Sequence, residues 1–520
     1  MLWHRNRSSG RPSRGDVCVG GRWAAALSVG LAVSGALATQ PLGDLSGPWI
    51  LLVDDYPVDH REQLARTYHP FEKYPSNPVL EPTEPWEDSI AYIYGTVLPE
   101  ESGNGLRMWY HTMRPEDPDN DGSNILYATS PDGITWTKPN LGIRSWHGST
   151  ANNMIYNRPG PGGITSVMHT PWELDPARRY TFMNYDIGGY WGAWSPDGVH
   201  TVDVPGNPVL TGGGDVGQFV HDPGTGRFRA YVKLNSYVNG LKRRSVGHCD
   251  TDTITSWPPP ELILEPDAFD DRWVPAGTVQ RTHFYGLSAF PCESHYLGFL
   301  WIFRATDPEG YYVGPVYSEI VSSHDGIHWV RQEGSRPAML PLGPPGAWDD
   351  GQLYTARAPV RVGDRLWLYY GACDGQHGEP TKLLNCAIGL ATLRKDGFAS
   401  LDAGSTPGTL TTLPIAGAAG LLRVNFTTTA GGRLKAEVLD VEGQILPGYA
   451  LADCVPLAGD SVDRAVRWSQ HAQLPAGGGP LRLRFELQNA SLYSFTAGGD
   501  TMRAPSPAIV AQPSSRSATV

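Results

Sequence analysis

The chain has 520 residues, more than one hydrophobic core usually organises, so we expect two domains. Its formal net charge of -12 would repel phosphate backbones, so we do not expect nucleic acid as a partner. A neutral polymer such as a glycan is compatible with this charge. Glycine (61 residues), proline (45), Trp (17) and Tyr (23) are abundant, and no long amphipathic helical pattern occurs. This composition predicts an all-β fold of short strands joined by tight turns.

The first 38 residues have the pattern of a secretory signal peptide. Five arginines and a single acid precede or border the apolar run 24–36, and Ala36-Leu37-Ala38 fits a cleavage site. We therefore expect a signal peptide over residues 1–38 and a secreted or periplasmic protein. The alternative is a disordered basic N-terminus of a cytosolic protein. No later run approaches the ~18 apolar residues of a spanning helix, so no membrane span is expected.

An internal repeat follows. A strand ending in a small polar residue leads into a turn built on Asp and usually Gly, and this motif occurs five times, at 130–136, 195–198, 250–257, 323–329 and 395–398. A hairpin precedes each turn, so the repeating unit is a four-stranded blade. We predict a five-bladed β-propeller over residues 39–405, closed by an outer strand from residues 51–70; a six-bladed ring is the structural alternative.

Extended, proline-containing links lead into four of the predicted innermost strands, and each link ends in carboxylates. The acids are Glu87-Asp88, Asp215, Asp270-Asp271 and Asp349-Asp350. Innermost strands of a propeller line its central channel. We therefore expect these carboxylates to converge at one mouth of the channel.

After residue 405 the composition shifts to Gly, Ala, Leu and Thr. Apolar residues alternate with polar ones at 434–439 and 481–487, which predicts strands with one buried face. We expect a β-sandwich over residues 406–497 and a disordered tail over residues 498–520.

Several motifs carry a resemblance to a known superfamily. They are Val53-Asp54-Asp55-Tyr56, residues 127–136, Tyr285-Gly286-Leu287 with Phe290-Pro291-Cys292-Glu293, and residues 367–371. From about residue 50 to the end of the sandwich, the chain resembles the five-bladed propeller glycoside hydrolases of families 32, 43, 62, 68 and 130, and more closely the bacterial proteins described as "glycosyl hydrolase family 32 N-terminal-like". The resemblance implies a glycosidase that acts on a carbohydrate substrate. The family 32 patterns Asn-Asp-Pro-Asn-Gly and Arg-Asp-Pro are absent, so fructan chemistry is not implied.

Glycoside hydrolysis needs one carboxylic acid and one carboxylate. We expect Asp88 to be the base or nucleophile, Asp215 an orienting or pKa-tuning partner, and the acid to be Asp350, Asp271 or Glu293. The alternative for each is a carboxylate that caps a strand end. A propeller that binds glycans without catalysis is the alternative for the whole protein, which we expect to be a monomer that requires no cofactor.

Six further residues are candidates for substrate binding. Arg281 and His283 precede a predicted innermost strand and suit a sugar hydroxyl, a carboxylate or a phosphate; phosphate would make the enzyme a glycoside phosphorylase. The candidates for stacking on a sugar or lining the channel are Tyr92, Trp191, Trp273 and His377. The alternative for these rings is packing between blades.

Two further motifs concern metal binding and disulfide formation. Asp117, Asp119 and Asp121 alternate before Gly122 like the first half of a Ca²⁺ loop, but no Glu stands at the twelfth position. They form either a partial Ca²⁺ site or a solvated acidic loop. Cys373 and Cys386 flank a predicted hairpin and form either a disulfide or buried free thiols.

Overall fold

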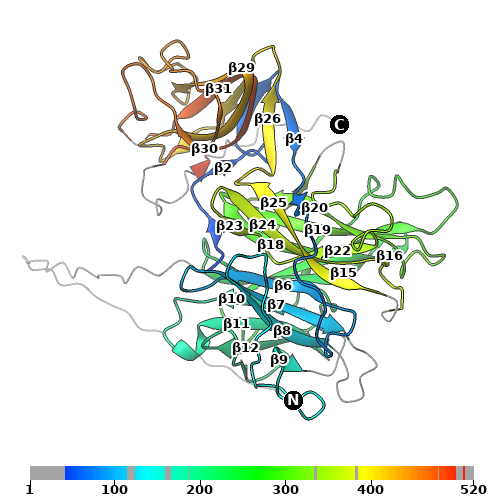
Figure 1. Ribbon diagram of the computed structural model, residues 1–520. Coiled ribbons are helices and arrows are strands. Elements are labelled where there is room, and N and C mark those ends of the chain that lie inside the picture. The colour runs from blue at the N-terminus through cyan, green and yellow to red at the C-terminus, as the bar shows by residue number, and fades with distance from the viewer. Residues whose placement is uncertain are drawn as a thin grey trace, which may run out of the picture. The chain divides into compact units, whose positions relative to one another are not determined.

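The computed structural model describes residues 41–113, 123–157, 165–186, 188–332, 336–380, 384–477, 479–498 and 508–509. Within these ranges the only helix is the short 3-10 segment η1 (Pro176–Arg178), so the described chain is all-β, as predicted (Figure 1). No helix in the described ranges has the length and apolar character needed to cross a membrane. The expected signal peptide, the Asp117, Asp119 and Asp121 loop and nearly all of the expected tail lie outside the described residues.

Three separate antiparallel sheets of four strands follow one another along the chain. The first contains β6 (Tyr92–Pro99), β7 (Leu106–Met113), β8 (Ser123–Ser130) and β9 (Met154–Asn157). The second contains β10 (Thr165–His169), β11 (Tyr180–Asp186), β12 (Gly189–Ser195) and β13 (Val202–Asp203). The third contains β14 (Gly217–Asp222), β15 (Arg227–Val238), β16 (Leu241–Thr251) and β17 (Glu261–Leu264).

Two further antiparallel units share one ten-stranded sheet, because the single parallel pair Val316–Gln352 joins them. One unit contains β18 (Arg281–Glu293), β19 (His295–Ala305), β20 (Val316–Ser323) and β21 (Trp329–Arg331), and β1 (Leu45–Ser46) is added to β18. The other contains β22 (Gln352–Thr355), β23 (Val360–Val362), β24 (Arg365–Cys373), β25 (Cys386–Arg394) and β5 (Glu72–Lys73). The outer strand of this last unit is therefore β5, not residues 51–70 as we expected.

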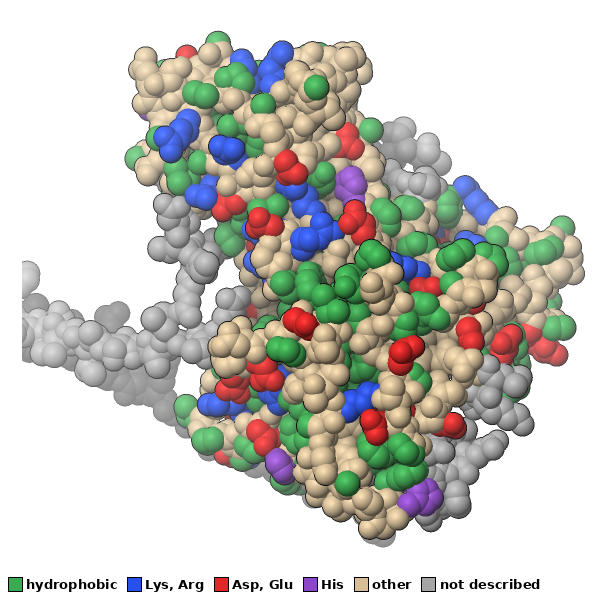
Figure 2. All heavy atoms as spheres, viewed as in Figure 1, with side chains coloured by type: hydrophobic (Ala, Val, Ile, Leu, Met, Phe, Trp, Pro, Cys, Tyr) green, Lys and Arg blue, Asp and Glu red, His purple; other side chains and the backbone are tan. Residues whose placement is uncertain are grey.

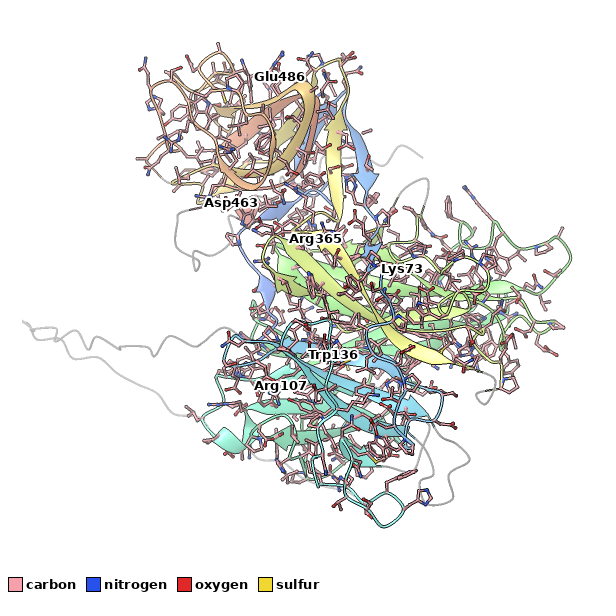
Figure 3. The ribbon with its side chains drawn as sticks, viewed as in Figure 1. Lys73, Arg107, Trp136, Arg365, Asp463 and Glu486 are labelled. Carbon is pink, nitrogen blue, oxygen red and sulfur yellow. A yellow bond between two sulfur atoms is a disulfide. The ribbon has the colours of Figure 1, made fainter. Side chains whose placement is uncertain are left out.

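The Asp turns connect neighbouring units. In the first turn, Asp132 Oδ1 accepts hydrogen bonds from the backbone N–H groups of Ile134 (2.9 Å) and Thr135 (2.7 Å), and the turns at Asp197 and Asp325 repeat this geometry. The glycine carbonyl of each turn then accepts a hydrogen bond from another unit. The donors are Tyr369 to Gly133, Trp109 to Gly198 and Tyr231 to Gly326, so the last unit contacts the first. Arg107 (Figure 3) adds hydrogen bonds to Tyr127 and Tyr180 beside the second of these contacts.

An eight-stranded sheet contains strands from residues 50–68 and from residues 399–496. It contains β2 (Ile50–Leu51), β3 (Val58–Glu62), β4 (Ala65–Tyr68), β26 (Ala399–Ala403), β27 (Gly408–Thr412), β29 (Arg423–Leu439), β30 (Asp460–Ala465) and β31 (Arg482–Thr496). Its core includes Phe426, Trp468, Phe485 and Leu492. Residues 51–70 thus supply β3 and β4 to this sheet, where they pair with β27 and β26. A separate pair joins β28 (Ile415–Ala416) and β32 (Ala508–Ile509).

The surface carries both signs of charge. On the face shown in Figure 2, acidic and basic side chains are interleaved among hydrophobic and neutral ones. The net negative charge of the chain therefore does not produce a single acidic field on this face.

Candidate functional site

Hydrogen bonds connect the first strands of several units: β10 and β14 are bonded to β6, and Arg357 N, just after β22, donates to Gly95 O of β6. Gln218 of β14 donates to the carbonyl of Tyr94 (2.6 Å), and Val167 of β10 donates to Thr96 Oγ1 (3.0 Å). The ends of β10, β14 and β18 line a hollow with Arg357 and residues 41–45. The beginnings of these strands lie away from this hollow, and we call the region around the beginnings of the first strands the entrance.

Three of the four acidic links carry two acids in succession, and the first acid of each pair is buried. Each first acid forms an ion pair with a cation from the outer part of its own unit. The pairs are Glu87 with Lys138 (2.5 Å), Asp270 with Arg331 (2.7 Å) and Asp349 with Lys73 (2.6 Å; Lys73 is labelled in Figure 3). A buried charge of this kind depends on its partner. The first acids therefore anchor the links.

The second acids, with Asp215, occupy the equivalent positions nearer to the strand beginnings. Asp88 is exposed and has a φ of 55°, which Asp tolerates better than most residues. Asp350 accepts a hydrogen bond from Gly346 N (2.6 Å), and Asp271 accepts one from Thr282 N (2.9 Å) and pairs with Arg243. The contact of Asp350 stays within its own link, whereas the ion pair of Asp271 joins its link to β16 of the preceding unit.

Asp215 lies in a group of five side chains, Asp215, Lys233, Arg244, Tyr285 and His377, which we call the entrance cluster. Asp215 forms an ion pair with Lys233 of β15. Lys233 Nζ lies 5.3 Å from the centroid of the Tyr285 ring, and the Arg244 guanidinium lies 5.8 Å from it. Partial burial would raise the pKa of Asp215, but the charge and hydrogen bond of Lys233 outweigh burial and lower it. Asp215 is therefore ionised at neutral pH while its side chain stays 42% exposed.

His377 completes the entrance cluster as a neutral imidazole. Burial, with the charge of Arg244 added, lowers the pKa of His377 to about 4. Because the carbonyl of Tyr312 can only accept, His377 Nδ1–H donates to it (2.9 Å), and Nε2 accepts from the Tyr285 hydroxyl (3.2 Å). Of the predicted sugar-contacting residues, His377 is the one that the structure brings beside Asp215 and Lys233.

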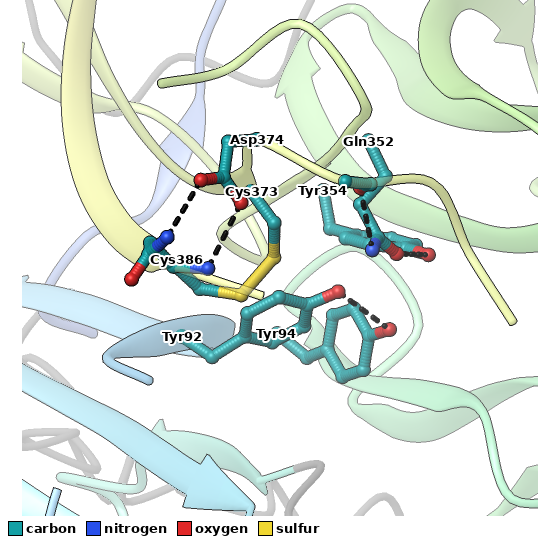
Figure 4. Close-up of a disulfide and its surroundings, with 9 residues drawn as sticks. Tyr92, Tyr94, Gln352, Tyr354, Cys373, Asp374 and Cys386 are labelled. Carbon is teal, nitrogen blue, oxygen red and sulfur yellow. Dashed lines mark hydrogen bonds between the residues drawn. A yellow bond between two sulfur atoms is a disulfide. The ribbon is translucent and has the colours of Figure 1, made fainter. Parts of the chain in front are cut away.

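Tyr92 lies deeper, in an aromatic group with Tyr94, Tyr354 and Trp301. Tyr92 is 5% exposed, its hydroxyl is 3.4 Å from that of Tyr94, and Tyr94 stacks on Trp301 with centroids 5.2 Å apart. Figure 4 shows Tyr92 and Tyr94 beside the Cys373–Cys386 disulfide, with Tyr354 bonded to Gln352 nearby. The structure thus contains the disulfide that the sequence left open, and it gives Tyr92 a packing role.

The side chains of Arg281 and His283 form hydrogen bonds with the backbone. Arg281 donates to the carbonyls of Lys242, Val279 and Glu309. His283 accepts from Arg244 N (2.9 Å) and its Nε2–H donates to the carbonyl of Gly310 (2.9 Å), while burial lowers its pKa to about 3. Both side chains position the chain around the start of β18.

The remaining candidates are dispersed. Trp273 donates to Thr282 Oγ1 (2.8 Å), and Trp191 lies half-buried on β12. Glu293 lies at the far end of β18 from Arg281, where it pairs with Arg361 (2.6 Å). Burial and the charge of Asp396 raise the pKa of Glu293 to about 7. The structure therefore does not bring Glu293 to the entrance with Asp215.

Sequence reasoning missed Lys233 and Arg244. Lys233 follows the apolar alternation of Phe228, Ala230 and Val232 in β15, and a lone Lys in such a strand is the signal that could have found it. Arg244 carried no comparable signal, because it follows Lys242 and Arg243 and looks like part of a solvated basic run.

No family model matches the chain, and no curated protein matches it. Among solved structures, a glycoside hydrolase is similar at 13% identity over 63% of this chain and 92% of that chain, with a TM-score of 0.40. A β-1,2-mannobiose phosphorylase from Listeria innocua is similar at 11% identity over 63% and 98%, with a TM-score of 0.40. A fructofuranosidase from Schwanniomyces occidentalis is similar at 10% identity over 80% and 96%, with a TM-score of 0.39.

These matches are carbohydrate-active enzymes of the group that the sequence motifs resemble. Their TM-scores lie below 0.5, so no residue role is transferred from them.

Proposed function

We propose that the chain is a glycoside-active enzyme that cleaves a glycosidic bond at the entrance, using carboxylates from the links. In this proposal the five antiparallel units are the blades of a five-bladed β-propeller, and the eight-stranded sheet is a β-sandwich. The beginnings of the innermost strands then surround one open site, and carbohydrate is the substrate class.

One observation carries the proposal. Asp215 is ionised, partly exposed and fixed by Lys233 beside the Tyr285 ring, within the entrance cluster. An ionised carboxylate suits the positive charge that develops on a sugar as its glycosidic bond breaks. Asp88 is then the base or nucleophile, Asp215 the orienting and electrostatic partner, and Asp350 or Asp271 the acid.

Phosphorolysis is a second candidate, favoured by two cations. Lys233 and Arg244 both lie within 5.8 Å of the Tyr285 ring centroid, and the charges of both lower the pKa of Asp215. A phosphate held there would replace water as the acceptor of the sugar. Lys233 and Arg244, instead of Arg281 and His283, would hold this phosphate.

The test is a screen of the purified chain on a panel of aryl glycosides and oligosaccharides, with and without inorganic phosphate. We expect turnover of at least one substrate, and a loss of ~10²-fold or more in kcat for Asp215→Asn and for Asp88→Asn. Asp252→Asn is the matched control, because that side chain is 86% exposed in a turn and pairs only with Arg227 at the surface. Equal turnover in all variants would contradict the site, and binding of glycans without any turnover would favour the non-catalytic propeller.

A further inference from the structure

A second group of polar side chains lies away from the entrance, where two histidines face one carboxylate. Asp54, His295 and His324 offer ligand atoms that all lie within 4.8 Å of one another, the only such group of three among the described residues. His295 begins β19 and His324 follows the end of β20, so the pairing Tyr296–Ser323 sets the two rings side by side, with centroids 4.4 Å apart. Asp54 comes from the segment that follows β2.

The two imidazole nitrogens that face Asp54 lack hydrogen bonds. Nε2 of His295 and Nε2 of His324 are buried atoms with no hydrogen-bond partner, and the His295 side chain is only 1% exposed. Their nearest carboxylate oxygens lie 3.6 Å and 3.5 Å away, on Asp54. An N–H···O hydrogen bond is normally 2.7–3.2 Å long, so the arrangement is too wide for direct bonds. Burying two unpaired nitrogens is costly unless a further group satisfies them.

The same spacing suits a metal ion. Ligand atoms at about 2.0–2.1 Å from a tetrahedral Zn²⁺ are about 3.3–3.4 Å from one another, close to the two separations on Asp54. Because the ligand atoms lie within 4.8 Å of one another, an ion would shorten the longest separation by at most about 1.5 Å. Two histidines and one carboxylate are a common ligand set for Zn²⁺ and for other first-row divalent metals.

The surroundings orient these ligands as the outer shell of a metal site does. Nδ1 of His295 is hydrogen-bonded to Ser294 Oγ (2.8 Å), which leaves Nε2 for the metal. Asp54 Oδ2 accepts from Ser322 Oγ (2.6 Å), and Asp54 Oδ1 accepts from Tyr56 N (3.0 Å). The Tyr56 ring stacks on His324 with centroids 3.4 Å apart and covers its partly exposed side.

We propose that Asp54, His295 and His324 bind a first-row divalent metal ion, with Zn²⁺ the best fit, independently of the glycan site. Three protein ligands leave a fourth position for water. Strand β2 belongs to the eight-stranded sheet, and the ion links the segment that follows β2 to strands β19 and β20. Its role is to hold this segment in place, so its binding raises thermal stability.

The test uses the full chain after treatment with a chelator. Addition of Zn²⁺ alone is expected to raise the Tm, and Co²⁺ is expected to give the visible absorption of a protein-bound ion. His324→Ala should abolish both responses, whereas His328→Ala, in the same turn but 88% exposed and outside the group, should keep them. Ser322→Ala should weaken Zn²⁺ binding ~10–100-fold without preventing folding.

The same titrations can overturn the proposal. If neither Zn²⁺ nor Co²⁺ changes the Tm or the absorption of the wild-type chain, the three residues form a metal-free group. If His324→Ala and His328→Ala respond alike to Zn²⁺, the ion binds elsewhere. Neither result would depend on glycoside turnover, so a failure here is separate from a failure of the proposed enzyme.

Discussion

At the scale of single residues, two acids that are adjacent in sequence have opposite environments. Glu87 is fully buried and accepts hydrogen bonds from the Tyr110 hydroxyl (2.6 Å) and from Lys138 (2.5 Å), whereas Asp88 is exposed. The positive φ of Asp88 turns the chain between them, so that consecutive side chains leave the link in different directions. We therefore assign a role in stability to Glu87 and a role in activity to Asp88.

Substitution of each acid should separate the two roles. Glu87→Gln is expected to lower the free energy of unfolding by ~3 kcal/mol, because it leaves Lys138 without its buried partner. Asp88→Asn keeps the shape of an exposed side chain and should change the free energy of unfolding by less than ~0.5 kcal/mol, while turnover falls. Denaturant unfolding measures the free energy of unfolding of each variant. A larger loss for Asp88→Asn than for Glu87→Gln would refute the structural role of Glu87.

The sequence could predict the positions of these acids but not their environments. The proline-containing links predicted acids ahead of the innermost strands, and Asp88, Asp215, Asp271 and Asp350 precede β6, β14, β18 and β22 in the chain. Which acid of a pair is buried depends on a cation in the outer part of the unit, such as Lys138, and that contact exists only after the sheet has formed. The metal-binding group was likewise invisible, since Asp54, His295 and His324 are far apart in the chain.

At the scale of elements, the fifth Asp turn departs from the others. Asp132 is exposed and its pKa is lowered, mainly by backbone hydrogen bonds from Thr135 and Ile134. Asp396, in the fifth turn, is buried under Ser494 of β31, its Oδ1 atom lacks a hydrogen-bond partner, and burial raises its pKa. The fifth turn therefore differs from the first in backbone as well as in electrostatics: Asp396 itself has a φ of 55°, whereas in the first turn the positive φ (75°) falls on Gly133.

The opposite pKa shifts of Asp396 and Asp132 predict opposite effects of substitution on the Tm. A raised pKa means that the contribution of the Asp396 carboxyl to stability is fully present below its unfolded pKa and is lost as the pH rises through its folded pKa. Asp396→Asn should therefore raise the Tm, and by more at pH 8 than at pH 5. Asp132→Asn, whose carboxyl has a lowered pKa, should instead lower the Tm at pH 8. Thermal melts at the two pH values test this, and a Tm decrease for Asp396→Asn at pH 8 would be the wrong sign.

Strand assignment from sequence succeeded where local pattern determines pairing. Four-stranded units and their turns follow from hairpins and Asp-Gly signals that lie close together in the chain. Residues 51–70 were misassigned because an alternating strand pattern does not say which sheet edge it will meet. Their partners, β26 and β27, lie more than 300 residues away in the chain, and both pair with β31 in the same sheet.

At the scale of the whole molecule, residues 41–45 line a hollow at the ends of β10, β14 and β18. The entrance cluster lies near the beginnings of β14 and β18, away from this hollow, and it is the region that we propose for a glycan. The metal-binding group is separate, because it joins the segment after β2 to β19 and β20.

The most direct measurement is a crystal structure of the Asp215→Asn variant with a bound oligosaccharide from the activity screen. The variant keeps the shape of the site and slows cleavage, so an intact ligand should be visible. We predict a sugar ring within hydrogen-bond distance of residue 215 and in contact with His377 or Tyr285 at the entrance. An oligosaccharide bound only to the eight-stranded sheet, or only in the hollow beside residues 41–45, would contradict the proposed site.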